Sequence, residues 1–189
     1  RNTFRYLLGN LNDNFNEMNM KDVDPKKLPE LEQFMLDKIY SLNLKFDKYF
    51  KEYDFHNLYK ELLNFCTVDL SAFYFDIRKD TLYCDQIDSP KRQSCIVVLN
   101  ILLNSLLKWF APILSFTTEE IYQLVSKKNK SIHLEKFLEF PKKFENEKIS
   151  KKWSDLIKIR DVCNISIEEK RASKEIGSSL EAELKIKLN

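Results

Sequence analysis

The segment from residue 90 to residue 110 constrains the fold more than any other part of the chain. Its middle is apolar almost all round, and Asn100 and Asn104 interrupt the run. A helix that is hydrophobic on every side has to be enclosed by other elements. Ser89 at the N-cap and Pro90 at the first helical position supply a start signal. We therefore expect a helix here, at the centre of a helical bundle.

The composition agrees with a helical protein and excludes other classes. Of 189 residues, 43% are hydrophobic, which is enough for a core, while 2 glycines and 5 prolines are too few for a turn-rich β protein. The apolar run is shorter than the ~20 residues that a membrane span needs, and no signal peptide is visible, so we expect no membrane partner. The net charge is only +2, so a nucleic-acid partner would have to be held by local charge clusters.

The sequence contains no recognisable catalytic or metal-binding motif. The four cysteines form no C-x-x-C pair, so we expect free thiols in a reducing cytoplasm and no metal site. Gly9 and Gly177 are the only glycines, which excludes a glycine-rich phosphate loop. His56 and His133 are expected to be packing or capping residues. The chain as given should therefore be non-catalytic.

Hydrophobic periodicity predicts further helices around the central one. We expect them at residues 4–11, 28–52, 54 to about 80, 117–125 and 147–171, with a polar linker at 12–27, an irregular lysine-rich segment at 126–143 and a possible extended piece at 132–134. The helix at residue 117 is expected to start with Thr117 and Glu120, which have capping-box spacing.

The last residues show a different period. Ala182, Leu184, Ile186 and Leu188 alternate with charged residues, which predicts a half-buried strand. A single strand is not stable alone, so its partners would come from sequence outside the chain, and we interpret the chain as a piece of a longer protein. The predicted fold class is mainly α: a helical bundle over residues 1–146, followed by a short C-terminal helix–strand appendage over residues 147–189.

The helix end near residue 80 is the strongest candidate for a binding site. Asp76, Arg78 and Lys79 are expected to be exposed where the helix runs out, and Tyr83 on the turn that follows. Carboxylates can accept hydrogen bonds from the exocyclic amines of bases, and a tyrosine ring can stack on an unstacked base. The same pattern also fits an ordinary helix C-terminus with local salt bridges.

Two further groups of cations accompany this cluster. Arg1 and Arg5 share one face of the first helix, with Asn2 beside them, and this polar face fits either solvent or phosphate and base contacts. Lys91 and Arg92 lie at a helix start, which the macrodipole disfavours. That placement weakly favours an external anion.

Several long sequence motifs resemble those of a known family. RNTFRYLLGNL at residue 1, FYFDIRKDTLY at residue 73 and WFAPILSFTTEEIY at residue 109 resemble the anticodon-binding region of bacterial-type isoleucyl-tRNA synthetases, which are class I aminoacyl-tRNA synthetases. These motifs occur in the same order as in the family, and together the similar segments cover most of the chain. The first word favours the isoleucyl enzymes over their valyl, leucyl and methionyl relatives.

The resemblance implies a bundle that binds the anticodon stem-loop of isoleucine tRNA with splayed bases. Carried over by position, it assigns tRNA contacts to Arg1, Asn2, Arg5, Asp76, Arg78, Lys79, Tyr83, Lys91 and Arg92. It also implies a monomeric cytoplasmic parent that uses ATP with Mg²⁺ and carries a zinc module, although this chain holds no cofactor. The HIGH-like and KMSKS-like signatures and the editing domain are missing here, so catalytic, editing and C-terminal modules would be its partners in the same protein.

Two other interpretations remain open. A helical scaffold that braces a catalytic domain or docks other proteins would leave the face around residues 76–92 without RNA contacts. The equivalent bundle of a sister synthetase would bind another tRNA.

Overall fold

A computed structural model describes residues 1–11, 15–126 and 130–187. Residues 12–14 of the expected linker, 127–129 of the lysine-rich segment and 188–189 at the end of the expected strand lie outside the described residues. Internal contacts divide the chain into two compact units, Arg1–Asn146 and Glu147–Asn189, which we describe separately.

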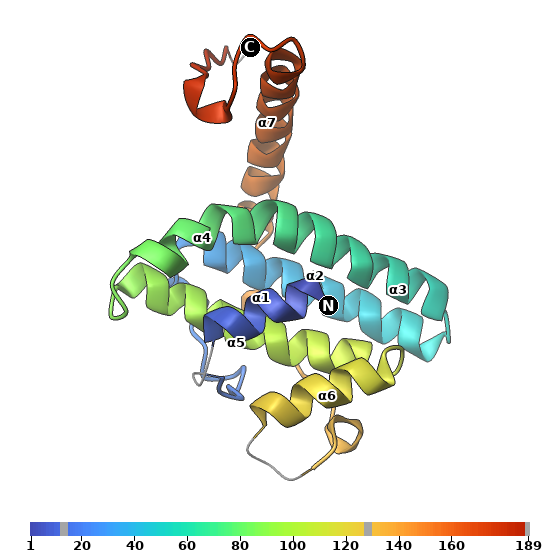
Figure 1. Cartoon of the computed structure of the whole chain (residues 1–189). Coiled ribbons are helices and arrows are strands. Elements are labelled where there is room, and N and C mark those ends of the chain that lie inside the picture. The colour runs from blue at the N-terminus through green and yellow to red at the C-terminus, as the bar shows by residue number, and fades with distance from the viewer. Residues whose placement is uncertain (12–14, 127–129, 188–189) are drawn as a thin grey trace. The chain divides into compact units, whose positions relative to one another are not determined.

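The first unit is a bundle of helices (Figure 1). Its helices are α1 (Asn2–Leu11), α2 (Glu30–Lys51), α3 (Phe55–Asn64), the π-helix η3 (Phe65–Tyr74), α4 (Phe75–Cys84), α5 (Pro90–Phe110) and α6 (Ser115–Val125). Short 3₁₀ turns lie at Pro25–Lys27, Ile132–Leu134 and Lys142–Phe144. The expected helical bundle is confirmed, whereas the extended piece expected at residues 132–134 is a 3₁₀ turn.

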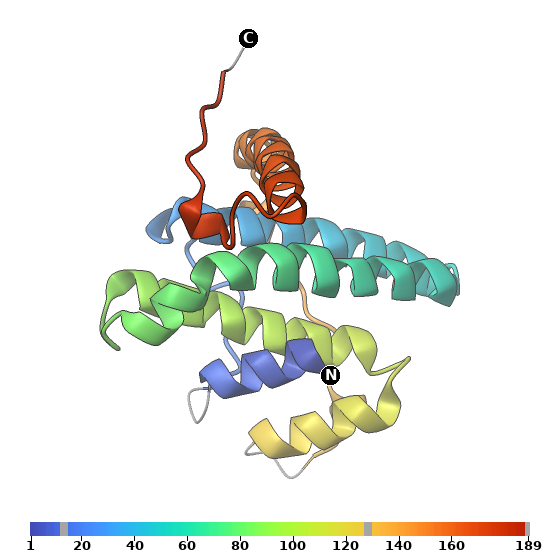
Figure 2. The same ribbon diagram turned by 45° about the horizontal axis from the view of Figure 1, so that its top comes forward.

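Helix α5 is the core of this unit. Every residue from Val98 to Phe110 is buried, and α1, α2, α4 and α6 all contact the helix. Both views show α1 running alongside α5 (Figures 1 and 2). By length and hydropathy α5 would pass as a membrane span, contrary to the expectation that the run is too short. Because the other helices of the bundle already cover it, we interpret α5 as the central helix of the core.

The buried Asn100 of α5 has a structural partner. The backbone N–H of Asn16 donates to Oδ1 of Asn100 at 2.8 Å, so the segment before α2 is tied to the core. Met20 and Val23 are buried with it. The described part of the segment expected as a polar linker is therefore attached to the bundle at Asn16, Met20 and Val23, and Asn16 supplies the hydrogen-bonding partner that the buried amide of Asn100 needs.

One long helical run forms α3, η3 and α4, and it extends further than the sequence indicates. The hydroxyl of Ser71 donates to the carbonyl of Cys66, five residues earlier, at 2.8 Å, within the wider π-helical turn. Helix α4 then continues to Cys84, so Tyr83 lies in its last turn and the expectation of a turn there is wrong. Phe75 and Leu82 are buried on the inner side, and this packing carries the helix past its charged residues.

Helix α6 starts two residues before the expected capping box. Its first residue is Ser115, so Thr117 lies inside the helix and does not cap it. The buried hydroxyl of Thr118 donates to the carbonyl of Leu114 at 3.0 Å. Residues 111–114 form the turn after α5, and Leu114 occupies the N-cap position without a side-chain cap.

The second unit contains one long helix and no strand among its described residues. Helix α7 (Glu147–Ala172) is followed by a 3₁₀ turn at Ser179–Glu181. Residues 182–187 are irregular, and the side chains of Leu184 and Ile186 are about half exposed. The predicted strand is therefore wrong for these residues. An alternating pattern becomes a strand only when a neighbour supplies its hydrogen bonds, and no described segment pairs with it.

The C-terminus of α2 contains a strained residue. Tyr53 has a φ angle of 57°, a left-handed conformation in which glycine is normal. The N–H of Asp54 donates to the carbonyl of Tyr49 at 2.9 Å, and that of Tyr53 to Phe50 at 3.3 Å. These two bonds form a Schellman motif around Tyr53.

We predict that Tyr53→Gly stabilises the chain. Relief of the left-handed strain should add about 1 kcal/mol and raise the melting temperature by roughly 2–4 °C, measured by thermal unfolding followed by circular dichroism. The matched control is Lys48→Gly, an exposed position inside the same helix, which should lower stability by about 1 kcal/mol. Equal destabilisation by both substitutions would contradict the prediction.

Candidate nucleic-acid interface

An open depression lies where α1 meets the end of α4. Its volume is about 390 Å³, within the ~300–1,000 Å³ typical of small-molecule sites. Five residues of α1 and one of α4 line it: Asn2, Arg5, Tyr6, Gly9, Asn10 and Tyr83. Three of the residues expected from sequence, Asn2, Arg5 and Tyr83, are thus brought together although 78 positions separate Arg5 from Tyr83.

Helix α1 presents its polar face to this depression. Asn2, Arg5 and Gly9 follow one another at i, i+3 and i+7 and are exposed, while Phe4 and Leu7 are buried on the other side. A Cβ added to Gly9 would meet open space. Packing inside the protein therefore does not require a glycine here, and its missing side chain widens the depression.

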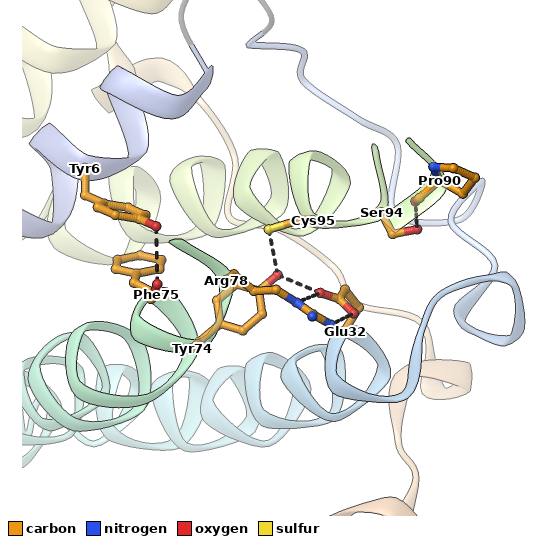
Figure 3. Close-up of polar contacts among 8 residues, drawn as sticks. All are labelled: Tyr6, Glu32, Tyr74, Phe75, Arg78, Pro90, Ser94 and Cys95. Carbon is orange, nitrogen blue, oxygen red and sulfur yellow. Dashed lines mark hydrogen bonds and ion pairs between the residues drawn. The ribbon is translucent and has the colours of Figure 1, made fainter. Parts of the chain in front are cut away.

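Tyr6 joins α1 to α4. Its ring stacks on that of Phe75, with centroids 4.1 Å apart and an interplanar angle of 17°, and its hydroxyl donates to the Phe75 carbonyl at 3.4 Å (Figure 3). Burial, and then the neighbouring Tyr83, raise the pKa of Tyr6 well above its ordinary value. The hydroxyl therefore stays a neutral donor beside the depression.

The outer face of α4 carries the other predicted contacts. Asp76, Lys79 and Tyr83 lie at i, i+3 and i+7, so they share one side of the helix. All three are exposed, Tyr83 to 67%, and Nζ of Lys79 lies 3.1 Å from Oδ1 of Asp76. The charge of Asp76 also contributes to the raised pKa of Tyr6. Because Tyr6 lines the depression, this face of α4 lies next to it.

Arg78 does not join the exposed cluster. Its side chain is buried, and its Nε and Nη2 atoms donate to the two carboxylate oxygens of Glu32, each at 2.6 Å. Tyr74 donates to the same carboxylate at 3.3 Å (Figure 3). The expectation that Arg78 is exposed at the helix end is therefore wrong, because the α4 register turns residue 78 inward with Phe75 and Leu82.

The remaining predicted cations do not line the depression. Arg1 is exposed just before α1, and its carbonyl accepts from the N–H of Arg5 at 2.9 Å. Lys91 is exposed in the first turn of α5. Arg92 is half-buried, and its Nη1 donates to the carbonyl of Asp85 at 2.7 Å, so it closes the end of α4.

Sequence reasoning missed three lining residues, Tyr6, Gly9 and Asn10. Nδ2 of Asn10 donates to the carbonyl of Tyr6 at 2.9 Å, one helical turn earlier. A glycine inside a helix costs about 1 kcal/mol relative to alanine, and this unused signal in the sequence was the one that pointed to Gly9. Over residues 1–11, 15–126 and 130–187 no group of three His, Cys, Asp or Glu side chains is arranged to hold a metal ion.

Comparison with known families decides what kind of chain this is. The family model for the anticodon-binding domain of tRNA ligase matches residues 32–186. The chain belongs to this family. The resemblance drawn from its sequence words is confirmed.

The similar curated proteins share one description. The isoleucine–tRNA ligase of Pelagibacter ubique (strain HTCC1062) is 69% identical over 100% of this chain, which covers 21% of that protein. Those of Agrobacterium fabrum and Brachyspira hyodysenteriae are 42% and 39% identical over 96% of the chain, which covers 18% and 20% of their lengths. The chain thus spans about a fifth of the length of these relatives.

A buried polar network of Glu32, Tyr74, Arg78 and Cys95 lies inside the bundle. We expect it to make the free energy of unfolding depend on pH. Burial raises the pKa of the Cys95 thiol to about 11, and the hydroxyl oxygen of Tyr74 lies 3.5 Å from its sulfur. The folded chain keeps this proton where an unfolded chain has lost it, so the contribution is complete below about pH 9 and is lost as pH rises towards 11.

We predict that Cys95→Ala makes alkaline destabilisation less steep. Between pH 9 and 11 the difference in slope should approach ~1.4 kcal/mol per pH unit, measured by urea unfolding at a series of pH values. Cys84→Ala is the control, because Cys84 is exposed and its removal should leave the slope unchanged. Identical slopes for wild type and Cys95→Ala would contradict the assignment.

Proposed function

We propose that the chain binds the anticodon stem-loop of isoleucine tRNA within a protein that attaches isoleucine to that tRNA. The observation that carries the proposal is the depression lined jointly by Asn2, Arg5 and Tyr83. It combines a cation, an amide and an exposed aromatic ring at one open site. Single-stranded RNA is bound by this combination, because its unstacked bases offer flat faces, polar edges and a phosphate backbone.

Each group has a distinct role in the proposed complex. Tyr83 stacks on a splayed base, worth about 1–3 kcal/mol. Arg5 holds a phosphate or a base edge, and the amide of Asn2 reads donors and acceptors on the neighbouring base. Gly9 lets the ligand approach the helix backbone closely.

The outer groups add attraction and orientation. Lys79, paired with Asp76, lies on the same α4 face as Tyr83, where its ammonium group attracts phosphate and the carboxylate can accept from a base amine. Arg1 and Lys91 are exposed and contribute salt-dependent phosphate contacts. Arg92 contributes through its free donors while it holds the end of α4. Arg78 is left out of the contact set.

The remaining chemistry belongs to the rest of the proposed protein. Relatives described as isoleucine–tRNA ligases are about five times as long as this chain. Activation with ATP and Mg²⁺, transfer, editing and a zinc module are assigned to those other parts, in a monomeric cytoplasmic enzyme. The role of this chain is to position the tRNA so that its distant acceptor end reaches the catalytic domain.

We predict that Arg5→Ala and Tyr83→Ala each weaken binding of a labelled isoleucine-tRNA anticodon stem-loop by roughly tenfold, about 1.4 kcal/mol. Fluorescence anisotropy at two salt concentrations measures this. Arg5→Ala should also lower the salt dependence, because one phosphate contact is lost. Valine and methionine stem-loops should bind less tightly to the wild-type chain.

Two matched variants control for general surface effects. Lys60→Ala removes an exposed cation of α3, and Phe116→Ala removes an aromatic ring of α6 that is 93% exposed. Neither residue lines the depression, so both variants should bind as wild type does. Equal losses from all four substitutions would contradict a defined site, and no binding by the folded chain would favour the helical scaffold.

A second prediction concerns the complete enzyme. Lys79→Ala in that protein should slow charging of isoleucine tRNA several-fold and leave isoleucine-dependent pyrophosphate exchange unchanged, because activation does not involve the anticodon. The two rates are measured on the same preparation. A parallel loss in both would point to misfolding and contradict the role of Lys79.

A further inference from the structure

A charged residue occupies the core stripe of α4. Phe75, Arg78 and Leu82 lie at i, i+3 and i+7 and are 5%, 7% and 3% exposed. An apolar side chain at position 78 would complete this stripe. Instead, the guanidinium of Arg78 meets Glu32, whose side chain is completely buried in the first turn of α2.

The ion pair between Arg78 and Glu32 constrains the orientation of α4 relative to α2. Two parallel hydrogen bonds of 2.6 Å join the planar guanidinium to the carboxylate, and Tyr74 donates to the same carboxylate while lying against Cys95 of α5 (Figure 3). A planar fork on a carboxylate has one favoured orientation. Apolar contacts tolerate sliding and rotation that this arrangement does not.

Stability alone does not account for such a pair. Removing two charges from water is costly, and a well-packed apolar pair of similar volume is often equally stable or more stable. What an apolar pair lacks is the fixed direction of the two hydrogen bonds. The feature to be explained is therefore orientation.

The helix whose orientation is fixed carries the proposed RNA contacts. Arg78 and Tyr83 are five residues apart, which places them about 140° apart around the helix axis. The ion pair of Arg78 on the buried side of α4 therefore also determines the direction in which the exposed face points. That face is formed by Asp76, Lys79 and Tyr83. Phe75 lies three residues before Arg78 on the same buried side of α4, and its ring stacks on that of Tyr6 in α1.

We propose that Arg78 is a positioning residue: its pair with Glu32 fixes the rotation of α4 so that Tyr83 faces the depression on α1. The inference rests on the proposed function of that depression. Arg78 does not touch RNA, although it lies in the same sequence word as residues that do. Its effect on binding passes through Tyr83.

A double-mutant cycle tests this role. Tyr83→Ala is introduced into the wild-type chain and into a chain with Glu32→Leu and Arg78→Met, which replace the ion pair by apolar side chains. The probe is a fluorescently labelled isoleucine-tRNA anticodon stem-loop. We expect Tyr83→Ala to cost roughly tenfold in wild type and less than twofold in the apolar background, with similar melting temperatures for the two backgrounds.

A third background protects the test against misfolding. Arg78→Lys keeps the charge but loses the planar two-bond fork, and it should also reduce the effect of Tyr83→Ala. The control background is Lys45→Ala with Glu61→Ala, which removes an exposed ion pair between α2 and α3, away from the depression. There the full tenfold effect should remain.

The outcomes separate the positioning role from the site itself. If Tyr83→Ala costs the same factor in every folded background, Arg78 is merely structural and the positioning role is overturned, while the interface stands. If Tyr83→Ala has no effect in wild type, the interface fails, and the positioning role fails with it. Loss of the Tyr83 effect in the apolar and lysine backgrounds, with its retention in the control background, supports the inference.

Discussion

The enclosure of α5 is the constraint on which the rest of the first unit depends. A helix with buried side chains on every side needs neighbours on every side, and α1, α2, α4 and α6 supply them. Their own apolar stripes turn towards α5, so their polar stripes turn outward. The depression follows from this arrangement, because α1 and α4 meet beside α5 and each presents a polar face there.

Polar groups inside the bundle determine the orientation of elements that apolar packing alone would allow to rotate or slide. Asn100 holds the segment before α2 through Asn16, and the buried pair of Glu32 and Arg78 joins α2 to α4. Buried polar groups without partners are costly, so each group admits few arrangements. Apolar burial therefore determines which helices meet, and the polar contacts determine how these helices are rotated.

The candidate site was predictable only in part from sequence. The family resemblance placed Asn2, Arg5 and Tyr83 in one predicted set of contacts, and in the structure these three residues line one depression. Arg78 was placed on the wrong side, since a charged residue beside Lys79 looks exposed until the carboxylate of Glu32 is found 46 positions away. Tyr6 went unnoticed because its partner Phe75 lies 69 positions away in the sequence.

The sequence by itself determined the helical class, the central position of α5, most helix positions and the family. These depend on local periodicity and on long motifs, which need no knowledge of neighbours. Tertiary structure alone decided that α4 continues through Tyr83, that Arg78 is buried and that α1 and α4 line one depression. It also decided that residues 182–187 form no strand, despite their alternation. The physical reason is common to all four: burial, ion pairing and strand hydrogen bonds require partners that the linear order of residues does not identify.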